Sequence, residues 1–356
     1  MKTGIANMPL HGGKAPRWLF EKMVELGREI TLAVVDEYSP EEYIQRLADP
    51  FWFQALGCVL GYDWHSSGLT TVTGGALKVA LKGIEKETGI FVCGGKGGTS
   101  RKTPDEILSF SAKSQISKSQ SQNLVYASKM AAKVDNTALQ DGYQLYHHNF
   151  FFTVDGKWSV VQQGMNKNNK MARRYHWFSE NLTDFTEEPQ AAVCCDDKKP
   201  SLNLVAKESR EARNFSVQLS SDTKTAWKDL EYIDSLDMPR HHQIYRKEKY
   251  ATTYLDKILG KIKEHNPENY EQLLSIKGVG PKTVRAFSLV GELIYGKKPS
   301  YKDPARFSFV HGGKDGVPYP VDENLYNKSI EVLRKGINKA NIDRSDKKKA
   351  FQRLEE

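Results

Sequence analysis

The sequence has few cysteines, and the four that it has do not form a metal-binding pattern. Cys58, Cys93 and the adjacent Cys194 and Cys195 lack the paired spacing of zinc sites and of disulfide frameworks. No hydrophobic run approaches the roughly 20 residues that a membrane-spanning helix needs. The first residues also lack the apolar core of a signal peptide. We therefore expect a cytoplasmic protein with reduced thiols and no membrane partner.

A modest excess of positive charge is present instead. The 356 residues include 52 Lys and Arg against 44 Asp and Glu, which gives a formal net charge of +8. Such a balance suits a polyanionic partner, although it does not identify one. The length is sufficient for two domains. We predict an α+β fold with a mixed domain at residues 1–200 and a mostly helical region at residues 201–356.

Several helices can be located from their apolar spacing. Residues 15–36 have an apolar stripe at helical spacing, and Ser39 and Glu42 form a capping box for a second helix. Residues 326–340 are amphipathic and are predicted to form the last helix. The charged residues after it are expected to fray. The apolar face of this last helix could pack against a second copy of the chain, so a homodimer is possible.

A β-hairpin is the clearest strand signal. Residues 143–154 and 157–165 flank Asp155-Gly156, a pair typical of two-residue hairpin turns. Such a turn pairs His148 with Gln163. Both faces are apolar near the turn, so the hairpin is predicted to be buried on both sides. Its far end collects polar residues, as a site entrance does; these are His147, His148, Asn149, Gln162 and Gln163.

Two other polar segments, residues 63–67 and 173–177, are expected to converge on this end of the hairpin. Phosphodiester cleavage needs an activated water, a group that stabilises the anionic transition state, and often a metal. Histidine suits proton transfer near neutral pH. Asp63 and His65 are the candidate ligands of Mg²⁺ or Mn²⁺. The candidate catalytic residues are Asp63, His65, His147, His148, Gln163, Arg174, His176 and Glu208. The alternative for each residue is a satisfied polar group in a large core.

The stretch 273–295 predicts two helices joined by the tight turn Gly278-Val279-Gly280, with Pro281 at the start of the second helix. The exposed N–H groups at that helix start would bind a phosphate, and Lys282 adds charge there. This segment resembles the helix-hairpin-helix of DNA repair enzymes, nucleases and ligases, which implies a grip on the DNA backbone. The alternative is an ordinary pair of packed helices.

DNA-binding residues are predicted in two places. One is the helix-hairpin-helix at residues 270–296, and the other is a glycine-rich loop at residues 94–102 that lacks the P-loop spacing. The candidates are Lys277, Gly278, Gly280, Lys282, Thr283 and Arg285 in the first, and Lys96 and Arg101 in the second.

Longer segments of the chain carry a further resemblance. HGGKAPRWL at 11–19, DPFWFQALGCVLGYDWHSSG at 49–68, QDGYQLYHH at 140–148 and HGGKDGVPYPVD at 311–322 resemble an archaeal and bacterial family, domain-of-unknown-function 763. QQGMN at 162–166, ARRYHW at 172–177 and NLVAKES at 203–209 fit it as well. The family name implies no activity; it implies that the N-terminal region and the helix-hairpin-helix belong to one protein.

The leading hypothesis is a structure-selective DNA nuclease that uses a divalent metal. In it the N-terminal polar cluster cuts and the helix-hairpin-helix holds single-stranded or structured DNA. A second hypothesis is a DNA glycosylase or abasic-site lyase with Lys282 as the nucleophile, because helix-hairpin-helix glycosylases have a Lys at this place and an Asp further on. Asp303 is the nearest Asp, but its surroundings do not match that family. A third hypothesis is a DNA-binding protein without enzymatic activity.

Overall fold

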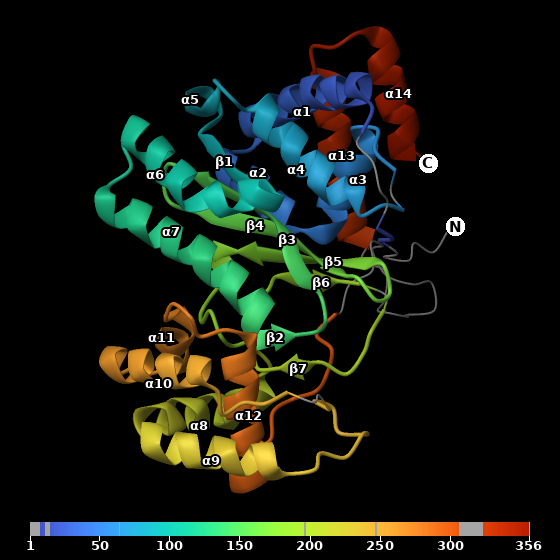
Figure 1. Cartoon of the computed structure of the whole chain (residues 1–356). Helices are drawn as coiled ribbons and strands as arrows, with labels where there is room; N and C mark the ends of the chain where they lie inside the picture. Colours follow the sequence, from blue (N-terminus) through green and yellow to red (C-terminus); the bar gives the residue numbers. More distant parts are fainter. Residues whose placement is uncertain are drawn as a thin grey trace.

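A central antiparallel sheet organises the chain (Figure 1). The computed structural model describes residues 8–10, 15–63, 65–195, 197–245, 248–305 and 323–355. The five strands of the sheet are, in spatial order, β1 (Ile90–Lys96), β3 (Gln144–Thr153), β4 (Trp158–Asn166), β5 (Met171–Phe178) and β6 (Ala192–Cys194). Two short strands, β2 (Leu139–Gln140) and β7 (Leu202–Asn203), pair separately. The predicted α+β fold is thus confirmed.

One face of the sheet packs against the N-terminal helices. These are α1 (Arg17–Glu37), α2 (Pro40–Ala48), α3 (Pro50–Val59), α4 (Gly68–Ala80) and the short α5 (Glu85–Thr88). The Ser39 hydroxyl accepts a hydrogen bond from the Glu42 N–H at 3.1 Å, so the predicted N-cap of α2 is formed. Val92, Phe151 and Val161 project from the sheet into this helical layer.

The last two helices return to the same layer. They are α13 (Glu323–Lys339) and α14 (Arg344–Glu355), which pack on α1 and α3 respectively. The last predicted helix is therefore present, but the expectation that the tail frays is wrong. Arg353 donates a hydrogen bond to the Val59 carbonyl at 2.9 Å, and Ala350 is buried, so α14 is fixed to the body of the protein. The apolar face of α13 is covered by α1. This face was the hint of a homodimer in the sequence, and it is not available to a second copy of the chain.

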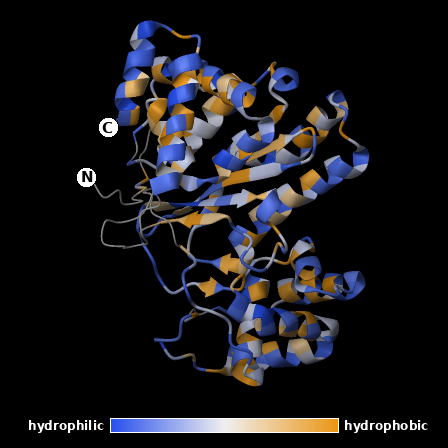
Figure 2. Ribbon diagram, turned by 180° about the vertical axis from the view of Figure 1, so that it is seen from behind, coloured by the Kyte–Doolittle hydropathy of each residue, from blue (hydrophilic) through white to orange (hydrophobic). Residues whose placement is uncertain are grey.

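The opposite face of the sheet is covered by α6 (Thr103–Lys113) and α7 (Lys118–Lys133) (Figure 1). A 3-10 turn, Gly97–Lys102, precedes α6, and a π-helical turn, Val134–Ala138, follows α7. Beyond α7 lies the C-terminal group of helices: α8 (Arg210–Ser221), α9 (Thr223–Ser235), α10 (Thr253–His265), α11 (Tyr270–Ser275) and α12 (Pro281–Tyr295). Figure 2 shows hydrophobic colours along the strands between the helical layers. Figure 1 places the group α8–α12 below the large sheet, next to β2 and β7. The predicted domain boundary near residue 200 stays a prediction.

The hairpin of β3 and β4 is present, but its register differs by one residue from the prediction. Thr153 donates its N–H to the Lys157 carbonyl at 2.9 Å, which closes a three-residue loop, 154–156, with Gly156 at φ +85°. His148 consequently pairs with Gln162 rather than with Gln163. Both faces of the hairpin are buried, as predicted.

Within the described part of the chain, no helix is long and apolar enough to cross a membrane. All four cysteines are free, as expected from their spacing.

Candidate functional site

A pocket of about 950 Å³, called the main pocket below, lies where α7, the polar end of β3 and the loop between α11 and α12 meet. Its walls contain His147 and His148 from β3, Lys277 from the loop and Arg101 from the 3-10 turn. These four residues were predicted from separate parts of the sequence. The structure brings them to one cavity, together with Ser128 on α7, which the sequence did not single out.

Two irregularities shape the wall of this pocket. A β-bulge at Tyr146 separates the Leu145 pair from the His147 pair in the β3–β4 ladder. The π-helical turn ends α7 early enough for the Asn136 side chain to accept a hydrogen bond from the Leu145 N–H at 3.2 Å. Both kinds of irregularity recur near functional sites, because they redirect side chains from regular positions.

His148 belongs to a chain of buried polar groups. Its Nε2 lies 3.0 Å from the Ser128 hydroxyl, and its Nδ1 lies 2.7 Å from Oε1 of Gln162. The Gln162 amide nitrogen donates to the Ala131 carbonyl at 3.0 Å and to the Asp135 carboxylate. Since both of these partners are acceptors, the amide orientation is fixed, and its oxygen faces His148. Nδ1 therefore carries the proton, and Nε2 accepts the hydrogen bond from Ser128.

Burial sets the charge of this chain. It lowers the pKa of His148 to about 4, with Gln162 opposing the shift, so the ring is neutral at pH 7. Burial likewise raises the pKa of Asp135 to about 7, against hydrogen bonds from Gln190, Trp177 and Gln162. The carboxylate of Asp135 accepts from Gln190 at 2.5 Å and from the Trp177 indole at 2.8 Å. A neutral His148 can accept a proton.

His147 borders the pocket, but its imidazole points to the opposite face of the sheet, toward Gly74 of α4. Burial, followed by the proximity of His148, lowers the pKa of His147 to about 3. Neither ring nitrogen has a well-placed hydrogen-bond partner among the described residues, and Asn149 is its polar neighbour. Both side chains face Gly74 of α4, where a Cβ would lie 2.0 Å from the Asn149 side-chain oxygen. Of the two histidines, His148 is the one placed for proton transfer with a hydroxyl.

The charged groups that line the pocket are all basic. Arg101 and Lys129 are exposed, Lys277 is exposed at the opposite wall, and Lys133 is half-buried. Lys133 also donates to the Ile276 carbonyl at 3.4 Å, which connects α7 to the loop after α11. Among the described residues that line the pocket there is no aspartate or glutamate. The cavity is therefore suited to an anion.

The segment at 270–296 forms two helices joined by a tight turn. Gly278 has φ +107°, and a Cβ there would lie 2.5 Å from Cδ1 of Ile258, so both conformation and space require glycine. Gly280 is the N-cap residue of α12, and Pro281 occupies its first turn. The loop places Lys277 in the pocket wall.

The other predicted DNA contacts lie in different surroundings. Lys282 is half-buried, with its ammonium 6.0 Å from the centre of the Tyr250 ring. Thr283 is buried, and Arg285 is buried in a pair with Glu248 at 2.5 Å and a hydrogen bond to Gln140 at 3.0 Å. Their side chains therefore hold α12 in place. Lys96 is exposed in an adjacent pocket of about 700 Å³ and lies 5.9 Å from the Tyr146 ring centre.

Asp63 and His65 do not line the main pocket. Asp63 is exposed, and its carboxylate accepts the His65 backbone N–H at 3.0 Å, which forms a local turn. Mg²⁺ and Mn²⁺ prefer carboxylate oxygens, whereas the main pocket offers imidazole, hydroxyl and amide groups. Among the described residues, no three His, Cys, Asp or Glu side chains are grouped to hold a metal. The donor set of the pocket does not fit these ions, and we derive no step through a metal.

Arg174 and His176 lie on the other face of the sheet, beneath α2 and α3. The Arg174 guanidinium donates to Gln54 at 3.1 Å, and its carbon lies 4.9 Å from the Phe53 ring centre. His176 contacts the Leu47 carbonyl through Nδ1 at 3.1 Å, and burial lowers its pKa. Neither residue lines the main pocket, so the structure does not bring them to the polar end of the hairpin.

Gln163 and Glu208 have different positions. Gln163 is buried, and its amide donates to the Ser67 carbonyl at 2.9 Å and to the Tyr146 hydroxyl at 2.5 Å. It thus holds Tyr146 at the β-bulge. Glu208 is exposed and lines a separate pocket of about 370 Å³.

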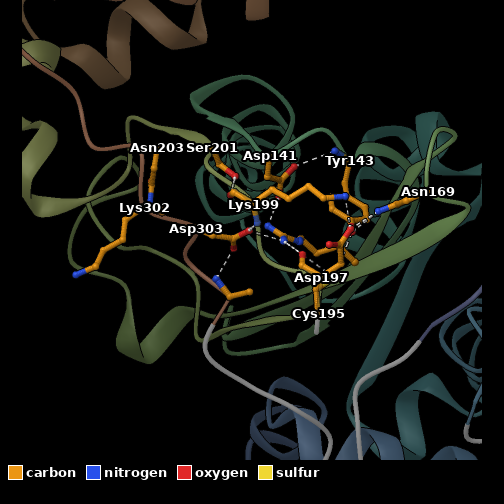
Figure 3. Close-up of polar contacts among 12 residues, drawn as sticks. Asp141, Tyr143, Asn169, Cys195, Asp197, Lys199, Ser201, Asn203, Lys302 and Asp303 are labelled. Carbon is orange, nitrogen blue, oxygen red and sulfur yellow. Dashed lines mark hydrogen bonds and ion pairs between the residues drawn. The ribbon is translucent and has the colours of Figure 1, made fainter. Parts of the chain in front are cut away.

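A buried charge cluster ties the sheet to the segment after α12 (Figure 3). Arg173 donates to Asp141 at 2.9 Å and to Asp303 at 2.7 Å, and all three side chains are almost fully buried. Asp303 also accepts from the Lys199 N–H at 3.0 Å. Asp303, the candidate partner of Lys282 in a lyase, is therefore engaged in an ion pair with the sheet.

The comparisons with known proteins bear on the chain as a whole. Residues 4–321 match the family model described as "Protein of unknown function (DUF763)". The chain belongs to this family. No curated protein and no solved structure matches it. The DUF763 match includes the main pocket, the charge cluster and the turn at 276–280, and the chemistry of this DUF763 protein has to be inferred from the site itself.

Sequence reasoning missed Ser128, Asp135 and the role of Gln162 in this DUF763 chain. Ser128 lies on an ordinary amphipathic helix, and Asp135 lies in the turn after it. The polar run at the end of the hairpin did indicate His148 and Gln162, but the predicted register separated them. The three-residue loop that the structure forms, in place of the expected two-residue turn, pairs them.

Proposed function

We propose that this chain is a DNA-processing enzyme that cleaves phosphodiester bonds in the main pocket. The observation that carries the proposal is the composition of that pocket. It places a neutral His148, bonded to a serine hydroxyl, beside Arg101, Lys129, Lys133 and Lys277. Cations stabilise the charge that develops on a phosphoryl group, and a neutral imidazole accepts the proton of the nucleophile.

The turn at 276–280 supports a nucleic acid as the substrate. Two helices joined by a turn, with a positive φ at Gly278 and a helix that starts at Pro281, support the helix-hairpin-helix that we propose for this segment. The backbone N–H groups in the first turn of α12 lack intrahelical partners and suit a phosphate. Because Lys277 extends from this turn into the pocket, a strand held by the turn would pass His148.

DNA in single-stranded or structured form is the substrate that we propose. The main pocket is lined by basic side chains and by the partly exposed Tyr126, a ring on which a base can stack. A preference for branched or single-stranded DNA over duplex follows if the unpaired strand has to enter the pocket.

Salt-dependent binding tests the grip on the backbone. We expect Lys277→Ala to weaken DNA binding and to reduce the slope of log K against log salt by about 0.7–0.9, the value for one lost phosphate contact. Lys86→Ala is the matched control, because Lys86 is exposed at the opposite end of β1 from the pocket. Fluorescence anisotropy at several salt concentrations measures both. Equal slopes for wild type and Lys277→Ala would contradict the proposed contact.

A further inference from the structure

Ser128 is the hydroxyl group on which the buried polar chain ends. It is 3% exposed and His148 is 5% exposed, yet both line the pocket wall. The only hydrogen bond of the Ser128 side chain in the described structure is the one to Nε2 of His148. A helical serine can instead donate to a backbone carbonyl of the preceding turn; Ser121 on the same helix does so, to Lys118 at 2.8 Å.

The orientation of the His148 ring is fixed by hydrogen bonds on the side away from Ser128. The Gln162 side-chain oxygen accepts a hydrogen bond from Nδ1–H of His148, and the Gln162 amide nitrogen donates to Asp135 and Ala131. A hydroxyl, a base and a third group that orients the base form the arrangement that activates a serine nucleophile. The basic side chains at the mouth of the pocket indicate an anionic substrate.

We propose that Ser128 is the nucleophile of a covalent phosphodiester transfer, with His148 as its general base. The assignment deepens the proposed function and rests on it for the substrate. Gln162 and Asp135 are positioning residues, because they act through the His148 ring.

The reaction needs only DNA and water. The Ser128 oxygen attacks phosphorus, and its proton passes to Nε2 of His148. The bond from phosphorus to one ester oxygen breaks, and that oxygen leaves with the proton from His148. The product is a Ser128–DNA phosphodiester and a free hydroxyl end. Water then attacks phosphorus, and His148 takes a proton from the water. The bond between phosphorus and the Ser128 oxygen breaks, and His148 returns the proton to that oxygen. The other end of the cut strand is released with its phosphate.

A fluorophosphonate probe tests the nucleophile without DNA. Attack by Ser128 on its phosphorus would release fluoride and leave a phosphonylated serine, which peptide mass spectrometry locates in the wild-type protein. We expect modification at Ser128, none in Ser128→Ala, and wild-type modification in Ser121→Ala. His148→Asn keeps a donor near the Nδ1 position but lacks Nε2, and should slow the modification about 100-fold or more. Modification of other serines only, or equal rates in His148→Asn, would overturn the proposal.

A trapping substrate tests the DNA step. An oligonucleotide with a sulfur atom in place of the bridging leaving oxygen should yield a protein–DNA adduct at Ser128 that survives denaturing electrophoresis. DNA cleavage by Ser128→Ala at the wild-type rate would refute Ser128 as the nucleophile, whereas the proposed nuclease function would stand. Probe modification of Ser128 in a protein that neither binds nor cuts DNA would support the nucleophile and refute the proposed substrate.

Discussion

At the scale of single residues, burial controls which histidines of the sheet carry charge. His147, His148 and His176 are all buried, and burial lowers the pKa of each. In the unfolded chain their pKa values return to about 6.5. Between pH 6.5 and the lowered values, the unfolded state binds more protons than the folded state, so these groups make stability decrease as the pH falls.

His147→Gln should therefore flatten the pH dependence of stability. The folded pKa of about 3 means that His147 makes the protein about 2 kcal/mol less stable at pH 5 than at pH 7.5. A glutamine cannot titrate, so the variant should lose about 2 kcal/mol less than wild type over this range. Urea unfolding at both pH values measures the difference. The exposed His241→Gln is the control, and a wild-type pH dependence in His147→Gln would contradict the assignment.

The sequence could indicate the histidines but not the chain that orients His148. A polar run at the end of an apolar hairpin is visible as a pattern, because buried polar groups need partners. Ser128 and Asp135 have no such signal, since their partners lie on other elements. Arg174 and His176 lie in a similar polar stretch of sequence, but they are buried beneath α2 and α3, whereas His148 lines the main pocket. Only the tertiary packing distinguishes them.

At the scale of elements, the turn between α11 and α12 depends on one glycine. Gly278→Ala places a Cβ at φ +107° and 2.5 Å from the Ile258 methyl, so we expect a loss of about 3 kcal/mol from conformational strain and overpacking. Gly296→Ala has a positive φ of 68° but open space, and should cost only about 1 kcal/mol. Urea unfolding compares the two variants.

Ile258→Val provides the internal check on that prediction. It removes the Cδ1 methyl that the new Cβ would meet. In the Gly278→Ala background it should recover part of the lost stability, whereas alone it should cost about 1 kcal/mol. Additive effects of the two substitutions would contradict the steric explanation.

The elements that carry a periodic or capping signal were predicted well from the sequence. Helices α1, α2 and α12 have apolar spacing, a serine cap or a proline start, and they lie where expected. Helix α14 was missed because it is highly charged, and its position depends on Asp346 and Arg353 contacts with α1 and α3. The hairpin register depended on one loop residue, which periodicity does not encode.

At the scale of the whole molecule, the charge cluster of Figure 3 joins the sheet to the C-terminal part. Asp303→Ala leaves Arg173 buried with Asp141 as its remaining carboxylate, and we expect a loss of about 3 kcal/mol. Lys302→Ala should change stability by less than about 0.5 kcal/mol, because that side chain is exposed and points away from the cluster in Figure 3. Thermal unfolding of the two variants tests the difference. Equal effects would show that the cluster does not stabilise the join.

The main pocket lies where the sheet, α7 and the C-terminal part meet. Its walls come from the sheet, from α7 and from the loop at 275–277, and Tyr126 of α7 donates to Glu271 of α11 at 2.6 Å. The sequence predicted a cutting part and a holding part, but it could not show that His148 and Lys277 line one cavity. Long-range packing decides this, and local patterns do not report it.

DNA cleavage is the most direct test of the account. Labelled single-stranded, branched and duplex DNA would be incubated with wild type, His148→Asn and Lys86→Ala, each with Mg²⁺, with Mn²⁺ and with EDTA, and DNA binding would be measured in parallel. We expect wild type and Lys86→Ala to cut, with single-stranded or branched DNA preferred, and His148→Asn to bind DNA without cutting it. Undiminished cleavage by His148→Asn, or binding by wild type with no product under any condition, would contradict the account.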